Sequence, residues 1–233
     1  MIQRAGFEAV ERDVVYDRCE KVATLIIQTV RILMAVQNRM NADEFLKKAR
    51  DANAWRSKAV SLRRSADLVW DEFSRRLLEA IDKETKSFDE NKFNAAVDLL
   101  RNSQFLYSLA AECALKGLII KQRPRDVIFE TSVDATGAII DAKIIQIGKS
   151  RIDTHNLEKL AEISGMVTTG KNAEIRELLA FSMHCINWIG RYPVPLDTNS
   201  NFLPRGTIPA VAFNHYYQDL MDPFLDIVLT GLS

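Results

Sequence analysis

Apolar positions recur at helical spacing through most of the chain. In residues 14–40 the apolar side chains fall three and four positions apart, and similar steps continue through residues 43–85. This spacing places apolar side chains on one face of an α-helix. The polar residues Asn38 and Asn41 interrupt the pattern. We therefore predict two long antiparallel helices joined by a short polar connection.

The strongest helical pattern spans residues 91–122 and ends before Pro124. One face of this helix carries Phe93, Val97, Leu100, Gln104, Tyr107, Ala111, Leu115 and Leu118. Small residues, among them Ala110, Ala114 and Gly117, gather in its second half. They would let a neighbouring helix approach closely.

The remaining chain mixes a short β element with further helices. The segments VIFETSV and AIIDAKIIQIG flank Asp134-Ala135-Thr136-Gly137 and predict a β-hairpin within residues 126–152. Two strands alone are marginally stable, so the hairpin should pack on helices or pair across a subunit interface. Thr154 or Asn156 should cap a short helix that ends near Ser164, and another helix is expected over residues 172–189. A last helix over residues 213–229 would be kinked or restarted by Pro223.

These patterns predict a mainly α fold: an up-down helical bundle with a long N-terminal helical hairpin and a small β-hairpin insertion. We expect the hairpin of residues 1–88 to pack on a bundle formed by residues 89–233, with the insertion at about 126–152. The composition, 47% hydrophobic and 27% charged, is that of a globular protein. Three dispersed cysteines and the absence of a signal peptide or long apolar run favour a cytoplasmic protein without membrane segments.

The net charge is zero, so general binding of polyanions is not implied. One local run is basic, and its members are Lys47, Lys48, Arg50, Arg56, Lys58, Arg63 and Arg64, against the single acid Asp51. A solvated helix face explains such a run, and a phosphate-contacting surface is the alternative.

The histidines give no sign of a metal centre. His155, His184 and His215 fall on three separate elements, without the spacing of a metal site and without a Cys or carboxylate cluster. The chain also has no GxGxxG, P-loop or GxSxG motif. We therefore predict neither a metal nor a cofactor.

Two local patterns remain as candidate chemistry. Glu112 and Lys116 form an i, i+4 pair on an otherwise apolar helix, which predicts that the pair is partly buried. Gly190-Arg191-Tyr192-Pro193 ends a helix. An arginine there can satisfy the last helix carbonyls, or it can hold a phosphate with two hydrogen bonds.

Three segments in order resemble the HEPN (higher eukaryotes and prokaryotes nucleotide-binding) domain family. They are AAECALKGLIIKQ, then THNLEKL at residues 154–160, then WIGRYP at residues 188–193. The resemblance covers about residues 90–230. It implies an up-down helical bundle, commonly a homodimer. Members of the family include metal-independent RNases of defence and toxin–antitoxin systems, partners of nucleotidyltransferases, and non-catalytic forms.

Catalytic members resemble one another in an Arg followed four to six residues later by His. Arg191 matches the arginine, but no histidine follows it in that window. His215 lies too far along the chain, and His184 precedes Arg191 by two helical turns. His155 matches a position that opens a helix, where we expect a cap or a hydrogen bond in the core.

The missing histidine favours a non-catalytic, dimeric module that binds RNA or a nucleotide in an accessory or regulatory role. Its candidate binding residues are Arg191, Tyr192, Glu112 and Lys116, and a nucleotidyltransferase is a candidate partner. One alternative is an RNase whose divergent active site combines Arg191 with His184 or His215. The other alternative is a helical scaffold in which the N-terminal hairpin is the working part.

Overall fold

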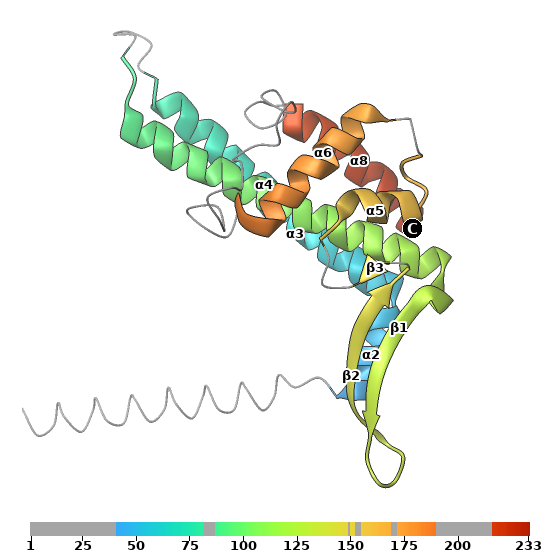
Figure 1. Cartoon of the computed structure of the whole chain (residues 1–233). Helices are drawn as coiled ribbons and strands as arrows, with labels where there is room; N and C mark the ends of the chain where they lie inside the picture. Colours follow the sequence, from blue (N-terminus) through green and yellow to red (C-terminus); the bar gives the residue numbers. More distant parts are fainter. Residues whose placement is uncertain (1–40, 82–86, 149, 152–154, 169–171, 190–215) are drawn as a thin grey trace, which may run out of the picture. The chain divides into compact units, whose positions relative to one another are not determined.

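The structure is a computed structural model that describes residues 41–81, 87–148, 150–151, 155–168, 172–189 and 216–233 (Figure 1). By its contacts the chain divides into two units, Met1–Phe45 and Leu46–Ser233. In the first unit the described residues 41–45 open a helix, where Asn41 Oδ1 accepts a hydrogen bond from the Glu44 amide at 2.7 Å. The predicted helix over residues 14–40 lies outside the described residues.

Two helices replace the single one predicted for residues 43–85. Helix α2 (Ala42–Arg50) ends just before Asp51, and helix α3 (Ala52–Glu79) starts after it. Asp51 is extended and its side chain accepts from the Asn53 amide at 2.9 Å, which makes it the N-cap of α3. The continuous helix was therefore a wrong prediction, because the apolar spacing continues across a capping residue that starts a new helix.

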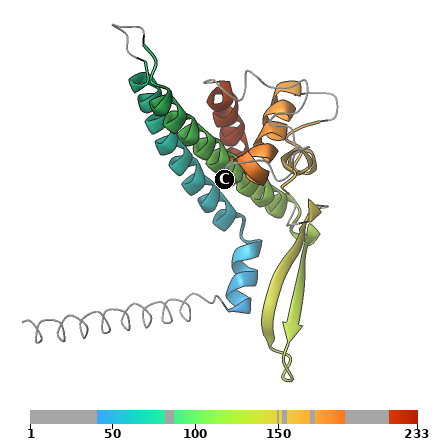
Figure 2. The same cartoon turned by 60° about the vertical axis from the view of Figure 1, so that its left-hand side comes forward.

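Helix α4 (Glu90–Gln122) is the central element of the second unit, and it confirms the helix predicted for residues 91–122. Asp89 caps it by accepting from the Lys92 amide at 3.0 Å. The helix packs along α3 for much of its length (Figure 2). It also contacts α5 (Leu157–Ile163), α6 (Ala173–His184) and α8 (Tyr216–Leu232). The mainly helical fold is thus confirmed.

A β-hairpin follows α4, as predicted for residues 126–152. After the 3₁₀ turn η1 (Pro124–Asp126), strand β1 (Val127–Val133) pairs antiparallel with β2 (Ile139–Ile147), and the two-residue strand β3 (Ser150–Arg151) pairs with β2. The connection is closed by Asp134, whose Oδ1 accepts from the amides of Thr136 at 2.8 Å and Ala138 at 3.0 Å. The guanidinium of Arg50 in α2 stacks 4.7 Å above the ring of Phe129 in β1.

The helices after the hairpin also follow the predicted order. Asn156 caps α5 by accepting from the Lys159 amide at 2.9 Å. Helix α6 passes at its end into a π-helix, η2 (Cys185–Ile189). Helix α8 is continuous through Pro223, so the proline does not restart the helix. None of the helices in the described part combines the length and apolar character of a membrane span.

A buried polar network ties α6 and α8 to α4. The Tyr217 hydroxyl lies 3.0 Å from Ser108 Oγ in α4 and 3.1 Å from Ser182 Oγ in α6, and Ser108 donates to the Gln104 carbonyl at 2.7 Å. All of these side chains are buried, and burial raises the pKa of Tyr217. The Tyr217 ring also contacts the rings of Tyr107 and Phe181. The three helices are therefore joined by both polar and aromatic contacts.

The small residues of α4 permit the close approach that its pattern predicted. A Cβ added at Gly117 would lie 2.9 Å from Trp55 Cβ in α3 and 3.3 Å from Leu232 Cδ2 in α8. A Cβ atom moves only with its backbone, so α3 and α4 would have to separate. The short distance between α3 and α4 therefore requires glycine at position 117.

We predict that Gly117→Ala lowers the free energy of unfolding by about 1–2 kcal/mol, since overpacking outweighs the gain in helix propensity. The matched control is Gly231→Ala in α8, where the nearest atom is the flexible Leu118 Cδ1 at 3.2 Å. Urea denaturation of both variants measures the effect. Equal stability of the two variants would contradict a rigid contact between α3 and α4.

Candidate functional site

Two charged side chains lie within the buried face of α4. Glu112 and Lys116 form an i, i+4 ion pair, and their side chains are only 8% and 5% exposed. The prediction that this pair is at least partly buried is therefore confirmed, and both side chains are almost fully buried. A buried carboxylate needs partners for both of its oxygens, and Lys116 supplies one of them through Glu112 Oε1.

His155 supplies the second partner. Its Nδ1 atom lies 2.9 Å from Glu112 Oε2, although the two residues are 43 positions apart in the chain. A carboxylate only accepts hydrogen bonds, so Nδ1 of His155 carries the proton of this contact. The other ring nitrogen, Nε2, takes no part in it. The side chain of His155 is 26% exposed. Lys116, Glu112 and His155 thus form a line of contacts that leads from the core to the surface; we call it the Glu112 cluster.

Local structure explains why the Glu112 cluster forms. His155 stands directly before Asn156, the N-cap of α5, so the start of that helix fixes its position. Leu157 and Leu160 in α5 are fully buried, and α5 packs on α4. Of the two roles expected for His155, the structure shows the hydrogen bond rather than the cap.

The cysteine beside the Glu112 cluster does not add a nucleophile. Burial, and next the charge of Glu112, raise the pKa of the Cys113 thiol to about 11. Cys185, at the start of η2, is fully buried, and burial raises its pKa as well. Within the described ranges, no group of His, Cys, Asp and Glu is arranged to hold a metal ion.

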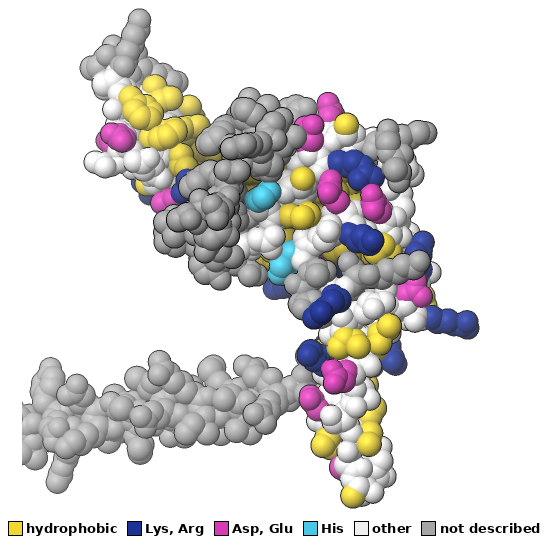
Figure 3. All heavy atoms as spheres, in the orientation of Figure 1, with side chains coloured by type: hydrophobic (Ala, Val, Ile, Leu, Met, Phe, Trp, Pro, Cys, Tyr) yellow, Lys and Arg dark blue, Asp and Glu magenta, His cyan; other side chains and the backbone are white. Residues whose placement is uncertain are grey.

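The next candidates are the residues of the predicted arginine turn and the two remaining histidines. Arg191, Tyr192 and His215 lie outside the described residues. His184 is the last residue of α6 and is half-buried, and burial lowers its pKa. Below pH 6.5 its neutral form is therefore favoured more than in an exposed histidine. Figure 3 shows the two described histidines on one face as separate patches.

The π-helix η2 precedes the arginine turn directly. It begins one residue after His184 and packs against α4. A π-turn holds one residue more than a turn of α-helix, and such turns are frequent at functional sites. Neither the π-turn nor its contact with α4 was predicted from the sequence.

The predicted basic run does not form one surface. Lys47, Lys48 and Arg50 lie on α2, and the other four residues lie on α3. Arg50 stacks on Phe129, and Arg56 Nε donates to a carbonyl of α8 at 3.5 Å. Arg50 and Arg56 of this run therefore have structural contacts.

Arg63 is occupied by two carboxylates of α8. Its Nη2 lies 3.0 Å from Asp222 Oδ1 and its Nη1 lies 2.5 Å from Asp226 Oδ1. The Asp222 oxygen is out of line with the N–H, so this contact is an ion pair without a well-directed hydrogen bond. Lys58 and Arg64 are both exposed, but they point about 120° apart around α3. Lys58 and Arg64 therefore do not converge on one phosphate.

Comparison with known proteins adds no relative: no family model, curated protein or solved structure matches the chain. The sequence pattern indicated Glu112 and Lys116 but not the contact between Glu112 and His155. One available signal was a lone carboxylate on a buried helix face, which must find a second partner.

We predict that Lys116→Met lowers the free energy of unfolding by about 3 kcal/mol, because it leaves the Glu112 carboxylate buried without its cation. The double variant Glu112→Leu with Lys116→Met should recover at least half of that loss. Lys159→Met, at an exposed position of α5, is the control and should change stability little. Additive losses in the double variant, measured by urea denaturation, would contradict the ion pair.

Proposed function

We propose that the chain is a HEPN-like helical module that binds RNA or a nucleotide through phosphate, without cleaving it. It would act as a homodimer in an accessory or regulatory role. The observation that supports this proposal is the contact between Glu112 and His155. It joins two of the three segments on which the resemblance rests, and the helix leading to the third segment packs on the same helix α4.

The charge of the Glu112 cluster supports binding over cleavage. Glu112 and Lys116 neutralise each other and are buried, so neither can reach a phosphate or exchange protons with a bound substrate. We therefore assign them a positioning role: they hold His155 and the start of α5 against α4. Arg191 remains the candidate for the phosphate contact, because a guanidinium can donate two parallel hydrogen bonds to phosphate oxygens.

A specific observation keeps the RNase alternative in view. Burial lowers the pKa of His184, which keeps a neutral imidazole available to accept a proton at neutral pH. Such a site would also need Arg191 to contact the phosphate. Binding and cleavage both require Arg191, but only cleavage shortens the RNA. One experiment with labelled RNA therefore distinguishes the two functions.

We predict that the purified protein binds a fluorescein-labelled single-stranded RNA or ATP, and that Arg191→Ala weakens binding at least tenfold through loss of a phosphate contact. Fluorescence anisotropy measures the affinity for RNA, with a salt series to show the electrostatic share. Arg125→Ala is the matched control, because it removes one exposed arginine from η1.

The same samples separate the alternatives on a denaturing gel with EDTA present. Intact RNA together with Arg191-dependent binding supports the proposal. RNA shortened by the parent protein but not by His184→Ala would establish the RNase instead. Absence of binding to both probes would reject the nucleic-acid role and favour the scaffold. Light scattering tests the homodimer, and co-purification with a nucleotidyltransferase tests that candidate partner.

A further inference from the structure

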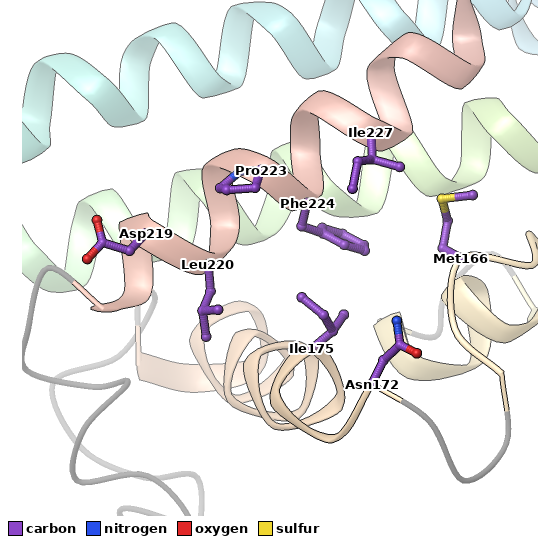
Figure 4. A pocket seen from close by; sticks show the side chains of 8 residues that line it. All are labelled: Met166, Asn172, Ile175, Asp219, Leu220, Pro223, Phe224 and Ile227. Atoms are coloured by element: carbon purple, nitrogen blue, oxygen red, sulfur yellow. The ribbon is translucent and has the colours of Figure 1, made fainter.

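A small apolar pocket lies between α6 and α8, among residues to which the proposed function gives no role (Figure 4). Its floor is Phe224, which is 5% exposed, and its walls are the half-buried side chains of Met166, Ile175 and Leu220. Ile227 stands at the rim and is 62% exposed. The helix α8 therefore presents apolar side chains on a second face, turned away from α4.

The size of the pocket limits what can enter it. Its volume is about 160 Å³. An apolar cavity of roughly 150 Å³ holds one benzene molecule, whereas sites for drug-sized ligands measure about 300 Å³ or more. The pocket thus accommodates a single ring or branched aliphatic side chain. Anchors of this kind, inserted into a pocket, dominate the energetics of many protein interfaces.

One residue gives the rim of the pocket a negative charge. Asp219 lines the pocket, is exposed, and has no ion-pair partner among the residues that the structure describes. Pro223 lies four residues later in the same helix and has no N–H. The carbonyl of Asp219 consequently lacks its usual i+4 donor. Asp219 thus places a carboxylate at the edge of the apolar pocket, and Figure 4 shows this carboxylate pointing outward from the hollow, toward the side from which a partner would approach.

A second polar group faces the pocket from α6. Asn172 adopts a left-handed backbone conformation, with φ 62° and ψ 49°, and its side chain does not cap α6. The amide is exposed and lines the pocket, where it can both donate and accept hydrogen bonds. It suits the backbone or a polar side chain of a bound segment.

Among the described residues, the two helices that border the pocket supply acidic groups and no unpaired Lys or Arg. Helix α8 contains Asp219, Asp222 and Asp226 but no Lys or Arg, and Arg63 of α3 binds the last two of these. The basic residue of α6 nearest to the pocket, Arg176, is held by Glu162 at 2.9 Å. The electrostatic field at Asp219 therefore favours a positively charged partner.

We infer that this pocket is a docking site for a protein segment that inserts one large apolar side chain, Phe, Leu or Met, and pairs a neighbouring Lys or Arg with Asp219. In a helical segment the two residues would stand at i and i+4, which lie on one face about 5–6 Å apart. An arginine can donate two parallel hydrogen bonds to the carboxylate of Asp219.

The β-hairpin of a second copy fits the pocket poorly. The exposed apolar residues near the tip of the β-hairpin are Val133 and Ile140, each 60% exposed or more. Each is followed directly by an aspartate, Asp134 or Asp141. Their insertion would bring like charges toward Asp219, which disfavours the contact.

Ligand-observed NMR with three compounds tests the recognition chemistry on the full chain. We expect phenethylammonium to bind with a Kd of roughly 1 mM, as suits a ligand of this size. Phenylpropionate should bind about threefold more weakly, because its anion meets Asp219. Ethylbenzene should fall between them. Asp219→Asn should remove the preference for the cation, whereas Asp71→Asn on α3 should retain it.

Ile227→Asn removes part of the apolar wall and should weaken binding of all three compounds at least threefold. Leu68→Asn is its matched control, since Leu68 is 71% exposed on α3 and outside the pocket. Both positions are exposed, so both variants should fold. An alanine-based helical peptide with Phe and Arg at i and i+4 should bind more tightly than phenethylammonium, and its Arg→Glu counterpart more weakly.

Three results would overturn the inference. The first is equal affinity for the cation and the anion, or no binding by any compound. The second is binding of phenethylammonium without tighter binding of the peptide, which would indicate a small-molecule site. The third is self-association in light scattering that Ile227→Asn abolishes, which would make a second copy the occupant. None of these results depends on RNA binding, so they are distinct from failure of the proposed function.

Discussion

The buried carboxylate of Glu112 constrains how the helices assemble around α4. Removing a carboxylate from water is costly unless both oxygens find donors or cations, and here one partner comes from the same helix and one from the start of α5. The contact with His155 therefore fixes α5 on α4 at the point where the chain returns from the β-hairpin. Helix α6 packs on both α4 and α5, so its position depends on that same anchor.

Periodicity predicted the elements whose packing depends on one helix face, and α4 is the clearest example. It could not predict the break at Asp51, because the residues on either side keep a helical rhythm and only the capping hydrogen bond to Asn53 ends it. The contact between Glu112 and His155 was also out of reach, since it joins residues whose separation in the chain carries no periodic signal. The pocket combines three segments and was missed for the same reason.

The two candidate sites use charge in different ways. In the Glu112 cluster, opposite charges meet inside the core and cancel, so the cluster orients side chains without attracting a ligand. At the pocket, Arg63 pairs with Asp222 and Asp226 of α8, while Asp219 lines the rim and has no such partner among the described residues. The charge that remains lies beside apolar surface. This combination suits recognition of an amphipathic segment better than recognition of phosphate.

Pro223 bears on this recognition because it is unfavourable for the helix that contains it. A proline inside a helix costs about 3 kcal/mol, through the lost hydrogen bond and the crowding of the preceding carbonyl. Helix α8 tolerates it because Tyr217, Met221 and Leu225 bury the opposite side of the helix fully against its neighbours. Packing explains why the helix tolerates the proline, while the Asp219 carbonyl lacks the i+4 donor that Pro223 removes. A bound donor that satisfies this carbonyl would offset part of the cost, and would do so only when a partner is docked.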